Sequence, residues 1–212
     1  MTGIIRNFAV FEGGDGSGTT TQLSLLGRRF SASNPVFYPT FEPTEGPAGK
    51  LVRAALKKEI TLLPETLARL FAADRTEHLY GPGGIAERCN SGELVVSDRY
   101  VLSSLVYQGI ECGDELPRAL NASFPAPELL LFFDVDPQIA QQRMQNRPQK
   151  EIYEYLEFQQ KVREKYRSLL AEFSAAGVRV EIIDASKTPE EVALEVWSAV
   201  RKMPILGEGT PQ

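Results

Sequence analysis

Cysteine is scarce in this sequence, which holds only Cys89 and Cys112 among its 212 residues. Two thiols at that spacing match no metal-ligand or redox motif, so neither a disulfide framework nor a cysteine metal centre is expected to organise the fold. Scarce cysteine also favours a reducing compartment, and we expect the cytoplasm. Because no run of about 18 apolar residues is present, no membrane-spanning helix is predicted, and the first residues lack the pattern of a secretory signal.

The chain also lacks an excess of positive charge. It carries 23 Lys and Arg against 28 Asp and Glu, which gives a net charge of -5. Such a balance provides no general attraction for nucleic acid or for anionic membranes, and we expect neither as a partner. An anionic ligand must therefore be held by a local cluster of basic side chains.

Five short apolar runs alternate with longer amphipathic segments. The runs cover residues 4–11, 36–40, 94–97, 129–134 and 178–184. Apolar residues recur at helical spacing in segments 19–31, 47–58, 64–80, 100–109, 136–147, 154–175 and 188–201. Strands that alternate with helices predict an α/β fold, with a five-stranded parallel sheet covered by helices on both faces.

A single domain is expected over residues 1–203, because a chain of this length can bury one core and shows no internal repeat. The polar and basic stretch "MQNRPQKEIYE" (144–154) interrupts two helical segments, and we interpret it as a short mobile lid. Residues 204–212 are expected to form a flexible tail.

The stretch "FEGGDGSGTTTQ" (11–22) follows the first apolar run and opens a helix. Glycines at this point are typical of a P-loop, in which backbone N–H groups and a helix N-terminus hold phosphate. Gly13, Gly18 and Thr20 fit the pattern G-x-x-x-x-G-K-[ST], but Thr19 stands where the pattern has lysine. The loop predicts a phosphate site with the Thr20 hydroxyl on Mg²⁺; the alternative is a glycine-rich turn that binds nothing.

Other candidate ligands follow the third apolar run. Since ligands of a parallel sheet collect at the carboxyl ends of its strands, Asp98 suits a metal-bound water and Arg99 a phosphate oxygen. The alternative is a structural ion pair. Phe71 and Arg75 lie one helical turn apart, where they can stack on and hydrogen-bond a base, or form a core phenylalanine beside a surface arginine. His78, the only histidine, is interpreted as a solvated helix residue.

Taken in order, these motifs closely resemble those of the thymidylate kinases. The resemblance runs from the glycine loop through "EPTEGPAGK", "LFAADR", "SDRYVLSSLVYQG" and "LLLFFDVDP" to "IIDASKTPEEV", and covers residues 4 to 200. It implies a three-layer P-loop NTPase-like fold with a lid, assembled as a homodimer. It also implies ATP- and Mg²⁺-dependent phosphorylation of dTMP to dTDP, a step in dTTP synthesis, with dTMP and ATP as small-molecule substrates.

The resemblance further implies roles for individual residues. Those expected to bind ATP are Gly13, Gly14, Asp15, Gly16, Ser17, Gly18, Thr19, Thr20, Thr21 and Arg143, the last of these against the adenine. Those expected to bind dTMP are Asp15, Phe71, Arg75, Arg99, Ser103, Ser104, Tyr107 and Gln108. Asp15 is expected at the sugar 3′-hydroxyl, and Tyr107 under the deoxyribose, where it excludes a 2′-hydroxyl. Catalysis is expected from Asp98, Arg99 and the lid cations Arg147 and Lys150, and metal binding from Thr20 and Asp98.

Two positions depart from the family pattern. Thr19 replaces the loop lysine, and Phe41 replaces an arginine that often precedes Glu-Pro. Two cationic contacts to phosphate are thereby absent, although Lys50 and Arg53 lie close to the second in sequence. Two other functions therefore stay open: a kinase of another pyrimidine nucleotide or deoxynucleoside, and a nucleotide-binding protein that has lost catalysis because of Thr19.

Overall fold

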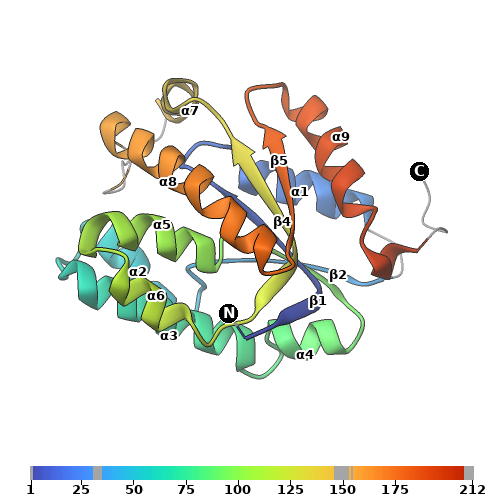
Figure 1. The fold of residues 1–212 in the computed structure, drawn as a ribbon, viewed down its shortest axis with the longest axis horizontal. Helices are drawn as coiled ribbons and strands as arrows, with labels where there is room; N and C mark the ends of the chain where they lie inside the picture. Colours follow the sequence, from blue (N-terminus) through green and yellow to red (C-terminus); the bar gives the residue numbers. More distant parts are fainter. Residues whose placement is uncertain (1, 31–34, 146–152, 154, 208–212) are drawn as a thin grey trace.

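A single five-stranded parallel sheet forms the centre of the fold (Figure 1). The computed structural model describes residues 2–30, 35–145, 153 and 155–207. The strands are β1 (Ile4–Gly13), β2 (Phe37–Phe41), β3 (Leu94–Asp98), β4 (Ala126–Asp134) and β5 (Arg179–Asp184). Their order across the sheet is β2-β3-β1-β4-β5, with every neighbouring pair parallel. The predicted α/β fold is confirmed.

The central strands are apolar on both faces because helices cover both. In β1, Phe8 and Val10 belong to one core cluster, whereas Ala9 and Phe11 belong to the other. Successive side chains of a strand point to opposite faces, so one apolar run supplies both cores. This burial explains why the sequence shows continuous apolar runs instead of alternating ones.

Helices form a layer on each side of the sheet. On one face α1 (Thr19–Arg29) and α9 (Pro189–Val200) lie side by side, with α7 (Pro137–Met144) contributing Ala140 to the same core (Figure 1). The opposite face is covered by α2 (Pro47–Leu56), α3 (Pro64–Tyr80), α4 (Ile85–Asn90), α5 (Val101–Cys112), α6 (Glu115–Asn121) and α8 (Leu156–Ala175). No helix within the described ranges combines the length and the apolar character needed to cross a membrane.

Two features of the structure differ from the predictions, and one prediction falls mostly on residues that the structure does not describe. Helix α6 was not predicted, because it is short and buries only Pro117 and Asn121, which leaves no apolar period to detect. The predicted tail starts too early, since Pro204–Leu206 form a 3₁₀ turn and Leu206 is buried in the core beneath α9. The predicted lid at 144–154 falls mostly outside the described residues.

The register of the sheet brings three strand ends to the same level. Phe11 of β1 pairs with Asp98 of β3, and Asp98 also pairs with Phe41 of β2. The glycine loop, the Asp98-Arg99 turn and the segment after β2 therefore emerge side by side at the carboxyl edge of the sheet.

Candidate active site

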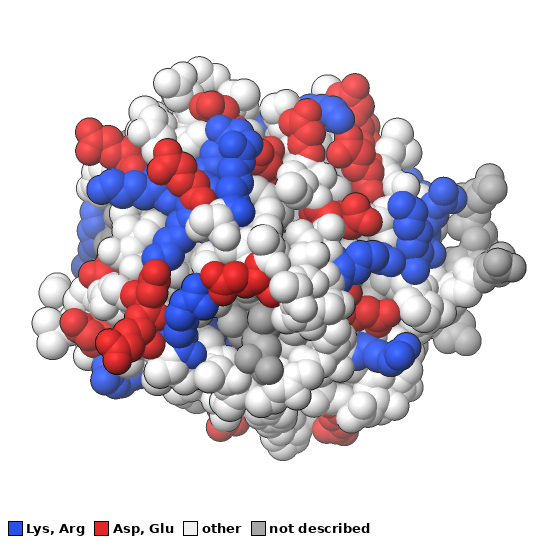
Figure 2. Space-filling model, viewed as in Figure 1, with Lys and Arg blue, Asp and Glu red and all other residues white. Residues whose placement is uncertain are grey.

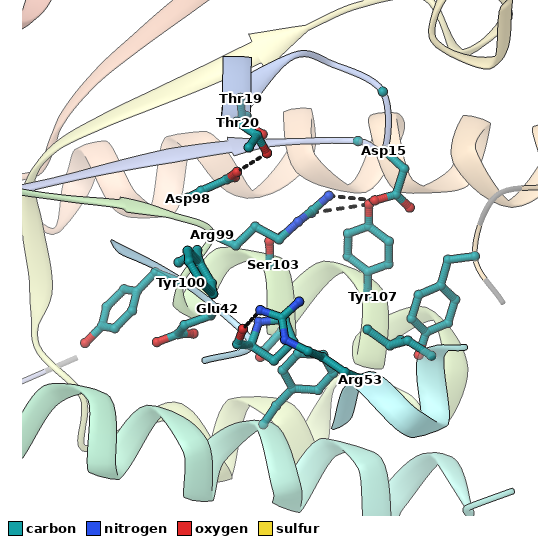
Figure 3. Close-up of a pocket in the computed structure, with 18 of the residues that line it drawn as sticks. Asp15, Thr19, Thr20, Glu42, Arg53, Asp98, Arg99, Tyr100, Ser103 and Tyr107 are labelled. Atoms are coloured by element: carbon teal, nitrogen blue, oxygen red, sulfur yellow. Dashed lines mark hydrogen bonds and ion pairs between the residues drawn. The ribbon is translucent and has the colours of Figure 1, made fainter. Parts of the chain in front are cut away.

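A cavity of about 590 Å³ opens at this carboxyl edge. The residues that line it come from the glycine loop, the ends of β2 and β3, and helices α1, α2, α3, α5 and α7 (Figure 3). All residues predicted to bind the acceptor line it: Asp15, Phe71, Arg75, Arg99, Ser103, Ser104, Tyr107 and Gln108. So do most of those predicted for ATP and metal: Gly14, Asp15, Gly16, Gly18, Thr19, Thr20, Thr21, Asp98 and Arg143. One cavity thus unites motifs from the whole chain.

A few predicted residues are placed elsewhere. Gly13 and Ser17 belong to the loop but are buried and do not line the cavity. A Cβ added to Gly13 would lie 2.6 Å from the Ser17 Oγ, so the loop is packed tightly at this point. Arg147 and Lys150 lie outside the described residues.

The backbone of the loop requires glycine at two turns. Gly16 and Gly18 have φ angles of 81° and 92°, in the left-handed region that L side chains rarely adopt. A Cβ on Gly16 would also lie 2.7 Å from the carbonyl oxygen of Ala140. Helix α1 then begins at Thr19 with no acidic residue in its own first turn, so no carboxylate of the helix itself offsets the positive end of its dipole. This arrangement suits a bound anion.

Positive charge in the cavity comes from arginine. Arg53, Arg75, Arg99 and Arg143 line it, and no lysine does so among the described residues. Thr19, at the position of the P-loop lysine, is buried at the start of α1. The loop itself therefore offers an anion only N–H groups and hydroxyls.

Thr20 and Asp98 form the pair that best fits a metal ion. The Thr20 Oγ1 donates a hydrogen bond of 2.6 Å to Oδ2 of Asp98, while Oδ1 of Asp98 is buried and has no partner among the described residues (Figure 3). A buried carboxylate oxygen without a partner is costly unless a ligand satisfies it. No cluster of three acidic, His or Cys ligands occurs in the described part of the chain, and Mg²⁺ suits such a site because it takes most of its ligands from water and phosphate.

Arg99 is held in a strained and well-defined position. Its backbone adopts φ 74°, and its N–H donates to the carbonyl oxygen of Phe11. Its Nη2 pairs with Oδ1 of Asp15 at 2.6 Å, and its Nη1 donates to the carbonyl oxygen of Gly13 at 3.0 Å. The guanidinium lies 5.2 Å from the ring centroid of Tyr107. The strand end thus carries a cation to the mouth of the glycine loop.

Gln159 of α8, which the sequence analysis did not identify, holds Asp15 from the other side. Its Oε1 accepts from the Asp15 N–H at 3.1 Å, and its Nε2 donates to Oδ2 of Asp15 at 2.8 Å. Both carboxylate oxygens of Asp15 therefore already accept one bond, but each has lone pairs left for a further donor such as a sugar hydroxyl.

A buried network fixes Arg75 in the cavity wall beside Phe71. Its guanidinium donates to Oε2 of Glu42 at 2.6 and 3.0 Å, and also to Asn121, Ser104 and the Tyr100 carbonyl. These bonds leave one Nη1 hydrogen without a partner in the described residues. Burial alone would raise the pKa of Glu42, but the charge of Arg75 and the bond from His78 outweigh it and hold that pKa below its ordinary value.

The interpretation of His78 as a solvated residue is wrong. Its Nδ1 lies 3.1 Å from Oε1 of Glu42, and its Nε2 lies 2.6 Å from Oγ1 of Thr40. Only 9% of its side chain is exposed. The helix face that carries Arg75 and His78 is directed at the end of β2 and at Glu42 just after it, which local sequence spacing could not reveal.

Arg53, which sequence reasoning named only as a neighbour, lines the cavity next to Phe41. Its guanidinium carbon lies 5.2 Å from the Phe41 ring centroid, and its Nε lies 3.4 Å from Oε1 of Glu45. It also donates to the carbonyl oxygen of Pro43. A cation is therefore present near the position where the family pattern has arginine and this chain has Phe41.

Arg143 also lines the cavity. It lies in the last turn of α7, and its Nη1 donates to the carbonyl oxygen of Ala185 at 2.8 Å. Its Nη2 lies 3.3 Å from the Ser186 carbonyl oxygen. Arg143 thus contacts the 184–188 loop, as expected of two segments that border one ligand.

Comparison with known proteins identifies relatives over most of the chain. A family model described as thymidylate kinase matches residues 11–196. A protein of Treponema pallidum is 45% identical over 167 residues, which cover 78% of this chain and 80% of its own. Proteins of Pyrobaculum aerophilum and Methanococcus vannielii are 40% and 37% identical over 197 residues, covering 92% and 91% of this chain and 97% and 94% of theirs. All three are provisionally named thymidylate kinases.

The Arg75–Glu42 pair gives a prediction about stability. Glu42→Gln should lower the free energy of unfolding at pH 7 by about 3 kcal/mol or more, because it leaves the buried Arg75 charge uncompensated. The matched variant Glu45→Gln, which alters the exposed pair with Arg53, should cost less than about 1 kcal/mol. Urea unfolding of both variants measures the difference, and equal costs would contradict the account.

The Arg75–Glu42 pair should also make the free energy of unfolding depend on pH in the acid range. The pKa of Glu42 is lower in the folded protein than its ordinary value of 4.5. The ionised Glu42 therefore contributes fully to the free energy of unfolding above pH 4.5, and this contribution is lost as the pH falls through the lower folded pKa. The difference in the free energy of unfolding between wild type and Glu42→Gln should accordingly shrink below pH 4.5.

Proposed function

Since the chain belongs to the thymidylate kinase family, we propose that it transfers the γ-phosphoryl group of ATP to the 5′-phosphate of dTMP, giving dTDP and ADP. The observation that carries this proposal is the shared cavity. It joins a phosphate-binding loop, at Gly16 and Gly18, to a pocket for a base at Phe71 and Arg75. A site that only hydrolysed ATP would not need the pocket for a base beside the phosphate-binding loop.

The acceptor is proposed to lie across the wall formed by α3 and α5. Its base stacks on Phe71 and receives a hydrogen bond from Arg75, while Asp15 accepts from the sugar 3′-hydroxyl. Tyr107 lies below the deoxyribose, and Arg99 with Arg53 faces the 5′-phosphate. That phosphate has a second pKa near 6, so it is mostly a dianion at pH 7 and attacks without a general base.

The donor is proposed to occupy the glycine loop. Loop N–H groups hold the β- and γ-phosphates, and Arg143 packs against the adenine beside residues 184–188. Thr20 and Asp98 hold Mg²⁺, which neutralises charge on the phosphates during transfer. Arg147 and Lys150 remain our proposed lid cations for the step in which the loop lysine usually acts.

Loss of catalysis through Thr19 is the less favoured alternative. The pairs Thr20–Asp98 and Asp15–Arg99 keep close hydrogen-bonded geometry at 2.6 Å each. The first pair is proposed to bind Mg²⁺ and the second to bind the acceptor. A protein that only binds a nucleotide does not require both.

We further propose that the enzyme acts in the cytoplasm as a homodimer, without nucleic acid or membrane partners. The family resemblance supports the dimer, and sedimentation velocity showing only a 23.5 kDa species would contradict it. Acidic and basic side chains are interspersed over the face in Figure 2, so that face offers a polyanion no continuous basic surface.

The choice of acceptor tests the proposal. Release of ADP should be fastest with dTMP, and dUMP should lose only about 10–200-fold in kcat/KM because it lacks one methyl group. UMP should be poorer still, since its 2′-hydroxyl meets Tyr107, which is buried against Arg99. A coupled assay with dTMP, dUMP, UMP, dCMP, dGMP and thymidine, corrected for ATP hydrolysis without acceptor, measures each rate.

Each alternative has its own signature in that assay. Comparable values for UMP and dTMP would refute the role of Tyr107, and preference for thymidine or dCMP would identify a different kinase. ATP binding without ADP release on any acceptor would identify a nucleotide-binding protein.

A further inference from the structure

Glu12 is a fully buried carboxylate that none of the roles above uses. It is the last residue before Gly13 of the glycine loop, at the carboxyl end of β1. Its side chain reaches away from the loop toward α5 and α8, where four hydrogen-bond donors surround it. A carboxylate is expensive to bury unless those bonds are made.

The first two donors belong to the start of α5. Oε1 of Glu12 accepts from the N–H of Tyr100 at 3.0 Å and from the N–H of Ser103 at 3.2 Å. Tyr100, the residue that caps α5, makes no side-chain capping bond of its own. Glu12 therefore caps this helix from a different strand, and a carboxylate is favoured at the positive end of a helix.

The other two donors are hydroxyl groups. Oε2 of Glu12 accepts from Oγ of Ser103 at 2.6 Å and from the hydroxyl of Tyr166 in α8 at 3.0 Å. Because Ser103 directs its hydrogen at Glu12, its Oγ keeps lone pairs that can accept from Nη1 of Arg99 at 3.3 Å. The Tyr166 hydroxyl, 2.8 Å from the same Oγ, has one hydrogen to donate either to Ser103 or to Glu12. The carboxylate thus sets the direction of the hydroxyl that receives the arginine.

We propose that Glu12 is a positioning residue for Arg99. Its carboxylate fixes the Arg99-Tyr100 turn and orients Ser103, so that the guanidinium is held toward the acceptor phosphate and the transferred group. This inference rests on the proposed phosphoryl transfer, in which Arg99 contacts those groups. The turn needs such support because Arg99 has a positive φ of 74°, which costs a non-glycine residue free energy.

The charge state of Glu12 is sensitive to pH. Burial raises its pKa to about 7, against the opposing effects of Ser103, Arg99 and Tyr166. The other ionisable groups around Arg99 are Asp15, Asp98 and Tyr107. Below pH 7 Glu12 takes up a proton, and the hydroxyl it then carries must donate to a neighbour that previously donated to it.

The test compares Glu12→Gln with wild type across pH. Glutamine has the same shape, but its amide N–H groups face Ser103 and Tyr166 and compete with Arg99 for the Ser103 oxygen. With dTMP and ATP at pH 8, kcat should fall about tenfold or more, since a shift of about 1 Å in a catalytic group can cost about a hundredfold. The KM for ATP should change little.

The ratio of the two kcat values gives the decisive readout. Protonation makes Glu12 neutral in the wild type, so the ratio of wild type to Glu12→Gln should approach one as the pH falls from 8 to 6. Titration of the dTMP phosphate affects both proteins equally and cancels in the ratio. A group with a purely structural role would change stability but would not give this pH-dependent ratio.

Glu128→Gln is the matched control. Like Glu12, Glu128 of β4 accepts a hydrogen bond from a backbone N–H, that of Asn7 in β1 at 2.7 Å, but Asn7 lies near the middle of β1 and away from the glycine loop. The kcat of Glu128→Gln should equal that of wild type. Circular dichroism should show that wild type, Glu12→Gln and Glu128→Gln are all folded. A Glu12→Gln kcat within twofold of wild type, or a ratio independent of pH, would overturn the proposal. Absence of dTMP phosphorylation by the wild type would instead overturn the proposed function.

Discussion

The parallel pairing of β1 with β3 is the constraint on which the site depends. By placing Phe11 opposite Asp98, it brings the glycine loop and the Asp98-Arg99 turn to the same edge of the sheet. Two short contacts then join them, between Thr20 and Asp98 and between Asp15 and Arg99. A slip of one residue would turn Asp98 to the opposite face, so the residues that we propose as metal and phosphate ligands meet only in this register.

Acidic side chains hold two of the cavity arginines, Arg75 and Arg99, in position. Arg75 is fixed by Glu42, and Arg99 by Asp15 directly and by Glu12 through Ser103. An arginine in such a network loses little freedom when a phosphate or a base arrives, which lowers the cost of binding. The acids also offset the positive charge that these arginines bring to the cavity.

Much of the fold and of the candidate site could be predicted from the sequence, and the residues that could not be predicted share one cause. The strands and the glycine loop carry local signals, and the resemblance supplied Phe71, Arg75, Asp98, Arg99 and Tyr107 as a set. The partners of those residues carry no such signal. Glu42 could be suspected from its Glu-Pro motif, but Gln159 is one polar residue in an amphipathic helix, and Glu12 ends an apolar strand. His78 was misread because its partners, Thr40 and Glu42, lie more than 35 residues away in the chain. Contacts between distant segments decide these roles, and spacing within one helix does not reveal them.

The central claim is that this cavity supports phosphoryl transfer although Thr19 replaces the loop lysine. Removal of one such stabilising group ordinarily costs about 10²–10³ in kcat. The most direct measurement is therefore kcat for dTMP phosphorylation by wild type and Thr19→Lys, with Ser24→Lys as a control that adds a lysine to the exposed face of α1. If backbone N–H groups and other cations already supply the stabilisation, Thr19→Lys should change kcat by less than about tenfold. A rise of about a hundredfold in Thr19→Lys alone would show that no substitute exists and would contradict the account.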